Sequence, residues 1–412
     1  MVPVLKDETM THPVSIVLSG IGGMGSVYVK ELLAKNNPSL FLIAGVVDPA
    51  PERCPQLGEL LGRGVPVFTS LESFYAAHRA DLAVISSPIQ FHCPQTALAL
   101  SHGSHVLCEK PAAATTQDVK KMIVTRDRAG KRVAVGYQWS FSAAVQDLKK
   151  DIRAGALGAP RFMKCLYLWP RDEIYYHRSD WAGKIKDSAG AWILDSPANN
   201  AMAHDLHNIF FILGGERDQS VRPAEVEAEL YRAHNIESFD TAAVRCRTEE
   251  GVDILFIVSH VSQCDTGPVF SYEFDGGTIS CRGRTTDISA ALVDGTMKNY
   301  GSPDAEPMKK LWDSVSMATK GGQPACGLEA AMSQTLCLNG IHDSQPSIVP
   351  FPNEIVRAAG EPGRRTIWVE GLDELLENCY EQGFLPSELG IAWAKKGRKI
   401  DLLHYRQFPS SL

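Results

Sequence analysis

The chain has 412 residues, which is long enough for two domains with complete hydrophobic cores. Its 44% hydrophobic and 22% charged residues are those of an ordinary soluble protein. The formal net charge of -7 at pH 7 argues against nucleic acid and against an acidic membrane surface as partners.

The cysteines and the N-terminus indicate the compartment. The 10 cysteines form no CxxC pair and no zinc-type spacing, so we expect free thiols and no bound metal. Residues 1–12 lack the apolar segment of a signal peptide, and we expect them to be a disordered lead-in. No run approaches the roughly 18 apolar residues of a membrane-spanning helix. We therefore expect a cytoplasmic protein.

The first predicted elements form a β–α–β unit. Residues 14–19 form an apolar run typical of a buried parallel strand, residues 24–35 have a helical pattern, and residues 40–47 form a second strand that ends at Asp48. The first strand is followed by the motif Gly20-Ile21-Gly22-Gly23-Met24-Gly25. Its glycines permit a tight turn, close approach of a pyrophosphate and close packing of the helix on the strand. The unit therefore predicts dinucleotide binding rather than a purely structural turn.

Asp48 indicates which dinucleotide binds. A carboxylate at the end of the second strand accepts hydrogen bonds from ribose hydroxyls and repels a 2′-phosphate. The residues that follow, Pro49, Ala50 and Pro51, supply no cation for such a phosphate. We therefore predict NAD as cofactor, with NADP as the less favoured choice.

Strands and helices continue to alternate as far as residue 136. Strands are predicted at residues 65–68, 82–85, 104–107 and 132–136, and helices at 71–78, 94–101 and 116–129. Residues 13–138 thus form a six-stranded NAD-binding Rossmann domain, in which ligands bind at the carboxyl ends of the strands. Glu109-Lys110-Pro111 follows one of those ends, where a lysine must be paired or used.

The second half of the chain has a different pattern. A helix at residues 143–154 and a strand at 161–169 precede strand-like runs without intervening helices, at 224–233, 242–247, 253–262, 269–274 and 277–282. We expect residues 139–357 to be an α+β domain with a large, open, mostly antiparallel sheet, so that the whole chain is of the α/β class. Residues 358–412, with a strand at 366–370 and a helix at 372–382, should pack on this domain or on a neighbouring subunit.

These motifs together resemble the Gfo/Idh/MocA family of nicotinamide-dependent oxidoreductases over roughly residues 12–355. The resemblance rests on the glycine motif and on four further stretches: Ser87-Pro88 with His92, Glu109-Lys110-Pro111, Gly136-Tyr137-Gln138-Trp139 and Gly155-Ala156-Leu157-Gly158. It implies a dehydrogenase acting on CH–OH groups of sugars or cyclitols, and a sheet face that packs on another subunit in a homodimer or homotetramer. The predicted cofactor-binding residues are Gly20, Gly22, Gly23, Met24, Gly25, Asp48, Ser87, Pro88, His92, Glu109, Lys110 and Gln138.

Residues 192–214 contain the second group of candidates. The back half reads as a buried helix that carries His204 and His207 on one face. The family typically carries Asp-x-x-x-His with a second Asp three residues later, and the alignment on the end of the helix places Asn200, His204 and His207 there. Asn200 cannot take a proton, so Asp195 is an alternative source of a carboxylate.

We predict that His204 acts as the base and that Lys110 hydrogen-bonds to the same substrate oxygen. The predicted catalytic residues are Lys110, His204 and Asn200, and the predicted substrate-binding residues are Lys110, Trp169, Arg171, Tyr176, Asp195, Asn200, His204 and His207. His207 could alternatively be a histidine of the hydrophobic core. The aromatic residues could alternatively belong to the core of the sheet. A metal site at His204, Asp205 and His207 lacks a further ligand at an obvious spacing.

Two other functions stay open at this point. An NAD-requiring glycosidase or lyase would oxidise the sugar transiently and regenerate its cofactor. A non-catalytic sensor would keep the fold and bind NAD without turnover.

Overall fold

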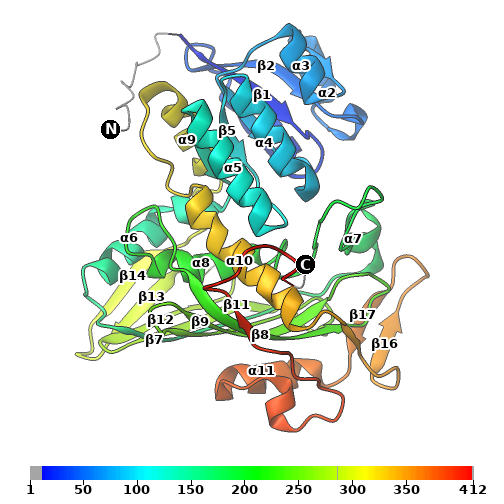
Figure 1. Ribbon diagram of the computed structural model, residues 1–412, viewed down its shortest axis with the longest axis vertical. Coiled ribbons are helices and arrows are strands. Elements are labelled where there is room, and N and C mark those ends of the chain that lie inside the picture. Colours follow the sequence, from blue (N-terminus) through cyan, green and yellow to red (C-terminus); the bar gives the residue numbers. More distant parts are fainter. Residues whose placement is uncertain (1–11, 285, 411–412) are drawn as a thin grey trace. The chain divides into compact units, whose positions relative to one another are not determined.

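The computed structural model describes residues 12–284 and 286–410, which divide into two compact units (Figure 1). Unit 1 is built from the chain up to Ala113, from Gln117–Phe141 and from Glu306–Met332. Unit 2 is built from Ala114–Thr116, from Ser142–Ala305 and from the chain that starts at Ser333. Apart from His12, the predicted lead-in lies outside the described residues.

Unit 1 contains a parallel sheet with the strand order β3-β2-β1-β4-β5-β6. This order confirms the predicted doubly wound Rossmann sheet. Two helical details differ from the prediction, because α2 was missed and α4 begins at His92 instead of residue 94. The elements are β1 (Val14–Ser19), α1 (Met24–Lys35), β2 (Phe41–Val47), α2 (Leu57–Gly62), β3 (Val67–Phe68), α3 (Leu71–Ala77), β4 (Leu82–Ile85), α4 (His92–Ser101), β5 (His105–Cys108), α5 (Thr116–Ala129) and β6 (Val133–Val135).

Residues 306–332 belong to unit 1, whereas the sequence placed them in the second domain. Helix α9 (Lys309–Lys320) packs on β1, β4 and β5, and the Trp312 indole N–H donates to Glu31 at 2.8 Å. The apolar positions of α9 resemble those of any amphipathic helix, so they do not reveal which sheet the helix covers. This return of the chain therefore had no local signal in the sequence.

Unit 2 contains a ten-stranded sheet with the order β14-β13-β12-β11-β7-β10-β9-β8-β15, and β18 pairs with β8. Only the β7–β10 and β8–β15 pairs are parallel, which confirms the predicted mostly antiparallel sheet. The strands are β7 (Pro160–Leu168), β8 (Pro223–Arg232), β9 (Thr241–Thr248), β10 (Asp253–Ser259), β11 (Thr266–Phe274), β12 (Gly277–Arg282), β13 (Ile288–Leu292), β14 (Met297–Gly301), β15 (Val349–Pro350) and β18 (Ile400–Asp401), beside a two-stranded sheet of β16 (Val356–Ala359) and β17 (Thr366–Val369). The helices are α6 (Ala143–Arg153), α7 (Glu173–His177), α8 (Ala203–Leu213), α10 (Leu328–Ser344) and α11 (Leu372–Gln382).

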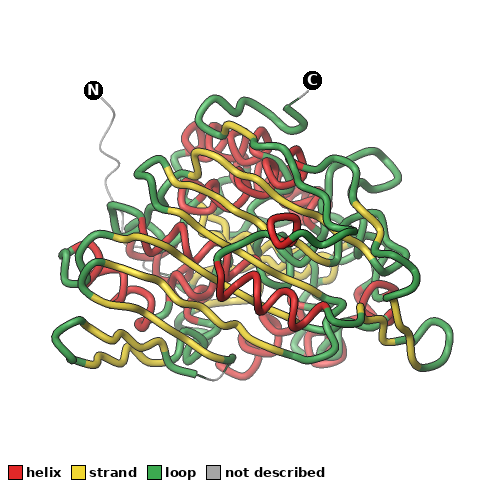
Figure 2. Tube along the Cα trace, turned by 90° about the horizontal axis from the view of Figure 1, so that it is seen from below, coloured by secondary structure: helices red, strands yellow, loops and turns green. Residues whose placement is uncertain are grey.

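Different helices cover the two faces of this large sheet. Figure 1 shows α8 on one face and α11 on the other, and in Figure 2 α11 lies across the strands on the side nearest the viewer. The face under α11 carries a buried cluster that joins strands β7–β10 to the chain after residue 350: Leu166, Leu168, Tyr231, Ala243, Leu255, Ile257, Val261, Phe351, Val369, Leu372, Leu376, Cys379, Tyr380 and Leu385. The C-terminal part of the chain therefore covers a sheet face that the resemblance assigned to a neighbouring subunit.

Leu376→Ala is expected to lower the free energy of unfolding by about 2–5 kcal/mol, because removal of a buried leucine side chain leaves a cavity. Leu376 lies on α11 within this cluster and is 1% exposed. Urea denaturation followed by circular dichroism measures the change. Glu377→Ala, on the exposed side of the same helix, is the matched control and should change the free energy by less than about 0.5 kcal/mol. Equal effects of the two substitutions would contradict a core role for α11.

Candidate cofactor and substrate sites

The glycine motif forms the turn between β1 and α1 in unit 1. A Cβ atom at Gly25 would lie 1.9 Å from the carbonyl oxygen of Gly20, so only glycine fits there. At Gly23, by contrast, a Cβ would meet nothing within 4 Å, and α1 begins at the next residue. The open side of the turn and the first N–H groups of α1 therefore have the chemistry that binds a pyrophosphate.

Asp48, at the end of β2, holds this turn in place. Its Oδ2 accepts hydrogen bonds from the backbone N–H of Ile21 at 2.8 Å and of Gly22 at 3.4 Å, and its Oδ1 accepts one from Ala50 at 2.9 Å. A carboxylate has about four acceptor positions, so it can also accept from ribose hydroxyls. Arg53 also lies beside this turn, because its Cβ is 3.8 Å from the position that a Cβ at Gly22 would occupy. Sequence reasoning did not include Arg53 among the residues near the cofactor.

His92 links two backbone turns at the carboxyl edge of the sheet. It is 1% exposed, with Nδ1 2.7 Å from the carbonyl oxygen of Pro111 and Nε2 2.9 Å from that of Ser87. Burial lowers the pKa of His92, although the two carbonyl oxygens act in the opposite direction. His92 was predicted to line the cofactor, but its buried ring instead ties the Ser87-Pro88 turn to the backbone beside Lys110.

Glu109 is buried behind Lys110, with 6% exposure. Its Oε1 accepts hydrogen bonds from the Tyr28 hydroxyl and from the Lys310 ammonium, each at 2.5 Å, and its Oε2 accepts one from the backbone N–H of Lys110 at 3.0 Å. The Lys310 ammonium also donates to the carbonyl oxygen of Gly136 at 3.2 Å. Glu109 was predicted to orient Lys110 or the nicotinamide ribose, and its buried carboxylate contacts Lys110 through the backbone N–H.

A buried ion pair therefore fixes the position of Lys110. Burial by itself raises the pKa of Glu109, but the charge and hydrogen bond of Lys310 and the hydrogen bond of Tyr28 outweigh it and hold that pKa below its usual value. A Cβ at Gly136 would lie 2.9 Å from the Glu109 carboxyl carbon, so the glycine makes room for the pair. Lys310 lies 201 residues after Glu109, which is why sequence reasoning missed it.

The predicted cofactor residues gather at one edge of the sheet of unit 1. The glycine motif follows β1, Asp48 follows β2, Ser87-Pro88 follows β4 and Lys110 follows β5. Gln138 begins a short helical turn after β6 and is partly exposed. Since the strands are parallel, all these positions lie at carboxyl ends, where open α/β sheets bind ligands.

In unit 2, Asp195 and Asn200 form one polar group. The Asn200 amide donates to Asp195 Oδ1 at 2.9 Å, and the backbone N–H of Gly183 donates to Asp195 Oδ2 at 2.7 Å. Asp195 is 2% exposed, whereas His204, in the first turn of α8, is partly exposed. Sequence reasoning treated Asp195 and Asn200 as alternatives, but the two are hydrogen-bonded to each other. A carboxylate therefore lies beside Asn200, the position at which the family pattern has an aspartate.

His207 lies in the core, one turn further along α8. It is 1% exposed, and its ring stacks on Phe211 with centroids 5.6 Å apart. Burial, with a contribution from the Lys149 ammonium, lowers the pKa of His207 to about 3, so the ring is neutral. This placement supports the core alternative rather than substrate binding. Among the described residues no three His, Cys, Asp or Glu side chains gather as a metal site would require, and this includes His204, Asp205 and His207.

The predicted substrate-binding aromatic residues divide into two groups. Trp169 is partly exposed, and the Arg171 guanidinium lies 3.5 Å from the centroid of its ring. Tyr176 is 8% exposed, with its hydroxyl 2.9 Å from Nδ1 of His260, so it points away from solvent. Its neighbour Tyr175 lies beside Arg171, with its ring centroid 4.6 Å from the guanidinium.

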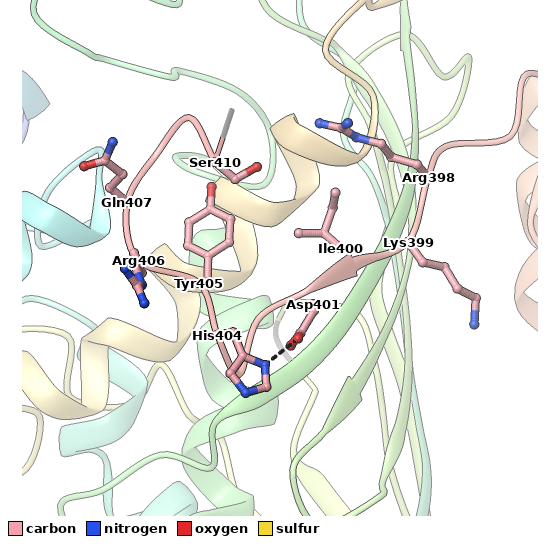
Figure 3. Close-up of a pocket in the computed structure, with 9 residues that line it drawn as sticks. All are labelled: Arg398, Lys399, Ile400, Asp401, His404, Tyr405, Arg406, Gln407 and Ser410. Carbon is pink, nitrogen blue, oxygen red and sulfur yellow. Dashed lines mark hydrogen bonds and ion pairs between the residues drawn. The ribbon is translucent and has the colours of Figure 1, made fainter. Parts of the chain in front are cut away.

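A further hollow in unit 2 is lined by the C-terminal segment (Figure 3). Two of its lining residues, His404 and Asp401, form a hydrogen bond in which Nδ1 of the histidine lies 2.6 Å from Oδ2 of the aspartate. All of its lining residues come from positions 398–410, and none was predicted as a site residue. The hollow therefore does not bring together groups from separate elements as a catalytic site does. In the described part of the chain, no helix is long and apolar enough to span a membrane.

Two family models match most of the chain. Residues 14–137 match the model described as "Oxidoreductase family, NAD-binding Rossmann fold", and residues 145–280 match the "GFO/IDH/MocA C-terminal domain". Among curated proteins, the chain is 32% identical over 149 residues to the rhizopine catabolism protein MocA of Rhizobium meliloti, which covers 36% of this chain and 45% of that protein. It is 28% identical over 155 residues to the D-glucoside 3-dehydrogenase of Escherichia coli K12, which covers 37% and 43%. The matched stretch thus spans less than half the length of these relatives.

Solved structures show the same fold. The WlbA dehydrogenase of Bordetella pertussis, in complex with NADH and UDP-GlcNAcA, superimposes with a TM-score of 0.67 at 22% identity, covering 81% of this chain and 97% of that one. An oxidoreductase of Agrobacterium radiobacter, in complex with NAD+, L-tartaric acid and magnesium, gives a TM-score of 0.64 at 18% identity, with 81% and 96% covered. At these identities the similarity establishes the fold alone.

Proposed function

Because the chain belongs to the Gfo/Idh/MocA family of oxidoreductases and carries its NAD-binding Rossmann domain, we propose that it is an NAD-dependent dehydrogenase of sugars or cyclitols. The observation that carries the proposal is Lys110, which is held at the carboxyl edge of the sheet by the buried Glu109–Lys310 pair. Burial of two charged groups is energetically unfavourable. A role in holding Lys110 in place would explain why this pair is buried.

Bound NAD supplies the acceptor for the hydride that leaves the carbinol carbon. In the proposal, the Lys110 ammonium donates a hydrogen bond to the substrate hydroxyl and stabilises the negative charge that develops on its oxygen. His204 takes the hydroxyl proton, and the hydrogen-bonded Asp195 and Asn200 orient the substrate. Asp48, with no cation in the three positions after it, favours NAD over NADP.

The proposal predicts that the purified protein reduces NAD in the presence of at least one member of a panel of sugars, cyclitols and their derivatives. The absorbance of NADH measures the reaction, and NADP in place of NAD measures the cofactor preference. NADH should form in proportion to the substrate consumed. Calorimetry that shows NAD binding, with no NADH from any member of the panel, would favour the sensor. Substrate cleavage without accumulation of NADH would favour the glycosidase or lyase.

The partners and the location are part of the same proposal. The substrate is a small sugar or cyclitol, and two or four copies associate through strands of the large sheet other than β7–β10, where the C-terminal part of the chain packs. Light scattering measures the number of copies. All 10 cysteines are free thiols, which suits a reducing compartment such as the cytoplasm.

A further inference from the structure

Unit 2 contains a row of alternating arginine and aromatic side chains, which we call the arginine–aromatic ladder. Trp169 lies between two guanidinium groups, with Arg171 at 3.5 Å and Arg284 at 3.9 Å from its ring centroid. The Arg171 guanidinium also lies 4.6 Å from the ring centroid of Tyr175. The Arg178 guanidinium lies 3.7 Å from the same centroid. In order, the ladder is Arg284, Trp169, Arg171, Tyr175, Arg178 and Trp181.

The ladder carries more positive charge than the protein neutralises. Arg284 forms a two-fold ion pair with Asp265, at 2.8 and 2.9 Å. Within residues 12–284 and 286–410, neither Arg171 nor Arg178 forms an ion pair. The nearest carboxylate in sequence, Asp172, accepts instead from the backbone N–H of Tyr175 at 2.9 Å and caps α7. Two guanidinium groups of the ladder are therefore left without a counterion from the described chain.

Arg171 is the arginine of the ladder whose surroundings are unfavourable for a charged side chain. Burial lowers the pKa of Arg171, and the neighbouring Arg284 and Arg178 act in the same direction. Its Nε is buried and has no hydrogen-bond partner among the described residues. Nε2 of the adjacent His260, whose carbonyl oxygen accepts from the Arg171 backbone N–H at 2.9 Å, is buried and unpartnered as well. Buried donors without acceptors are rare in folded proteins and indicate a partner that is absent from the chain itself.

The ladder adjoins the polar group of unit 2. Trp181 ends the ladder two residues before Gly183, whose backbone N–H donates to Asp195 at 2.7 Å. The Asp195 carboxylate is also close enough to Tyr175 to contribute to the raised pKa of that tyrosine, of which burial is the main cause. A ligand on the ladder would therefore lie beside Asp195 and Asn200.

We propose that the arginine–aromatic ladder binds an anionic group, a carboxylate or a phosphate, on the sugar or cyclitol that this protein oxidises. Guanidinium groups bind both anions through paired hydrogen bonds. A neutral sugar would leave Arg171 and Arg178 without a counterion, whereas an anionic one neutralises them. This inference rests on the proposed function and names the substrate class of the same site.

The test compares matched substrates that differ in charge. Glucose, glucuronate and glucose 6-phosphate, and likewise a cyclitol and its phosphate, are assayed for NADH formation and for binding by calorimetry. The anionic member of a set should have the higher kcat/KM and the tighter binding. The carboxylate and phosphate arms identify which anion is preferred. A preference for neutral members in every set would overturn the proposal.

Variants of the ladder test the residues directly. Arg171→Gln and Arg178→Gln should each raise KM and Kd for the preferred anionic substrate about ten- to a hundredfold, and by a much larger factor than those for the neutral member. Arg161→Gln is the control, since Arg161 is an exposed arginine of the same unit that is paired with Asp275. If Arg171→Gln fails to fold, the exposed Arg178 carries the test alone. Equal losses for neutral and anionic members would overturn the proposal.

The binding measurement separates this proposal from the proposed function. Arginine-dependent binding of an anionic sugar without NADH formation would support the ladder and refute the dehydrogenase. NADH formation that depends neither on substrate charge nor on either arginine would support the dehydrogenase and refute the ladder as its anion-binding site.

Discussion

Lys110→Ala is expected to lower kcat by about a thousandfold and to leave the affinity for NAD nearly unchanged. The loss follows from the proposed role of the ammonium, which acts on charge that develops only during the reaction. Steady-state kinetics with the substrate identified in the panel measures kcat, and fluorescence titration with NADH measures cofactor binding. Lys110 is only partly buried, so the variant should fold.

The control for this prediction is a lysine of the same unit that faces solvent. Lys121, on α5, is exposed, and Lys121→Ala should behave as the unsubstituted protein does. Unchanged turnover in Lys110→Ala would remove Lys110 from the catalytic residues. A loss of NAD affinity as large as the loss of kcat would make it a cofactor-binding residue instead.

The sequence predicts the parts of this molecule that depend on neighbouring residues. The strand of residues 14–19, the glycine motif and Asp48 are consecutive, and each has a local physical reason, so the Rossmann sheet and its binding edge could be read in advance. Trp169 and Arg171 were also predicted as site residues, because they belong to a run of aromatic and polar residues at the end of a strand. Local patterning thus predicted residues for both candidate sites.

The rest depends on pairings between distant parts of the chain. Lys310 is an ordinary lysine in an amphipathic helix until folding places it 2.5 Å from Glu109. Arg284 similarly contacts Trp169 only after folding, because Arg284 follows β12, Trp169 follows β7, and β11 lies between these two strands in the sheet. The helix at residues 372–382 was predicted, but nothing local shows that it covers the sheet of unit 2. In each case the partner is set by tertiary packing, which a single sequence does not encode in its local periodicity.

Lys310→Met is expected to be the most destabilising of these substitutions, by about 3–5 kcal/mol, because it leaves the Glu109 carboxylate buried without its counterion. The neighbouring Lys309 supplies a matched control. Lys309 pairs with Asp313 at 2.7 Å on the surface of the same helix, and Lys309→Met should cost less than about 1 kcal/mol. Urea denaturation at neutral pH measures both. Similar losses for the two lysines would show that the Glu109–Lys310 pair has no special role.

The partner substitution gives the same pair a second, independent measurement. Glu109→Gln should also destabilise, and the double variant with Lys310→Met should lose less than the sum of the single losses, because the two residues interact directly. Glu109 has a folded-state pKa below its usual value of 4.5, so its contribution to stability is present above that pH and is lost as the pH falls through the lower folded pKa. The stability difference between the unsubstituted protein and Glu109→Gln should therefore shrink on acidification below about pH 4.5.

Activity separates a positioning role of this pair from a purely structural one. If Glu109 and Lys310 hold the backbone of Lys110 for catalysis, the folded fraction of each variant should have a lower kcat at saturating NAD, with the affinity for NAD little changed. Lys309→Met should keep full kcat. A variant that is destabilised but retains full kcat per folded molecule would show that the pair stabilises unit 1 without positioning Lys110. The catalytic proposal would then depend on the side chain of Lys110 alone, since the hydrogen bond from its backbone N–H to Glu109 would be shown to be dispensable.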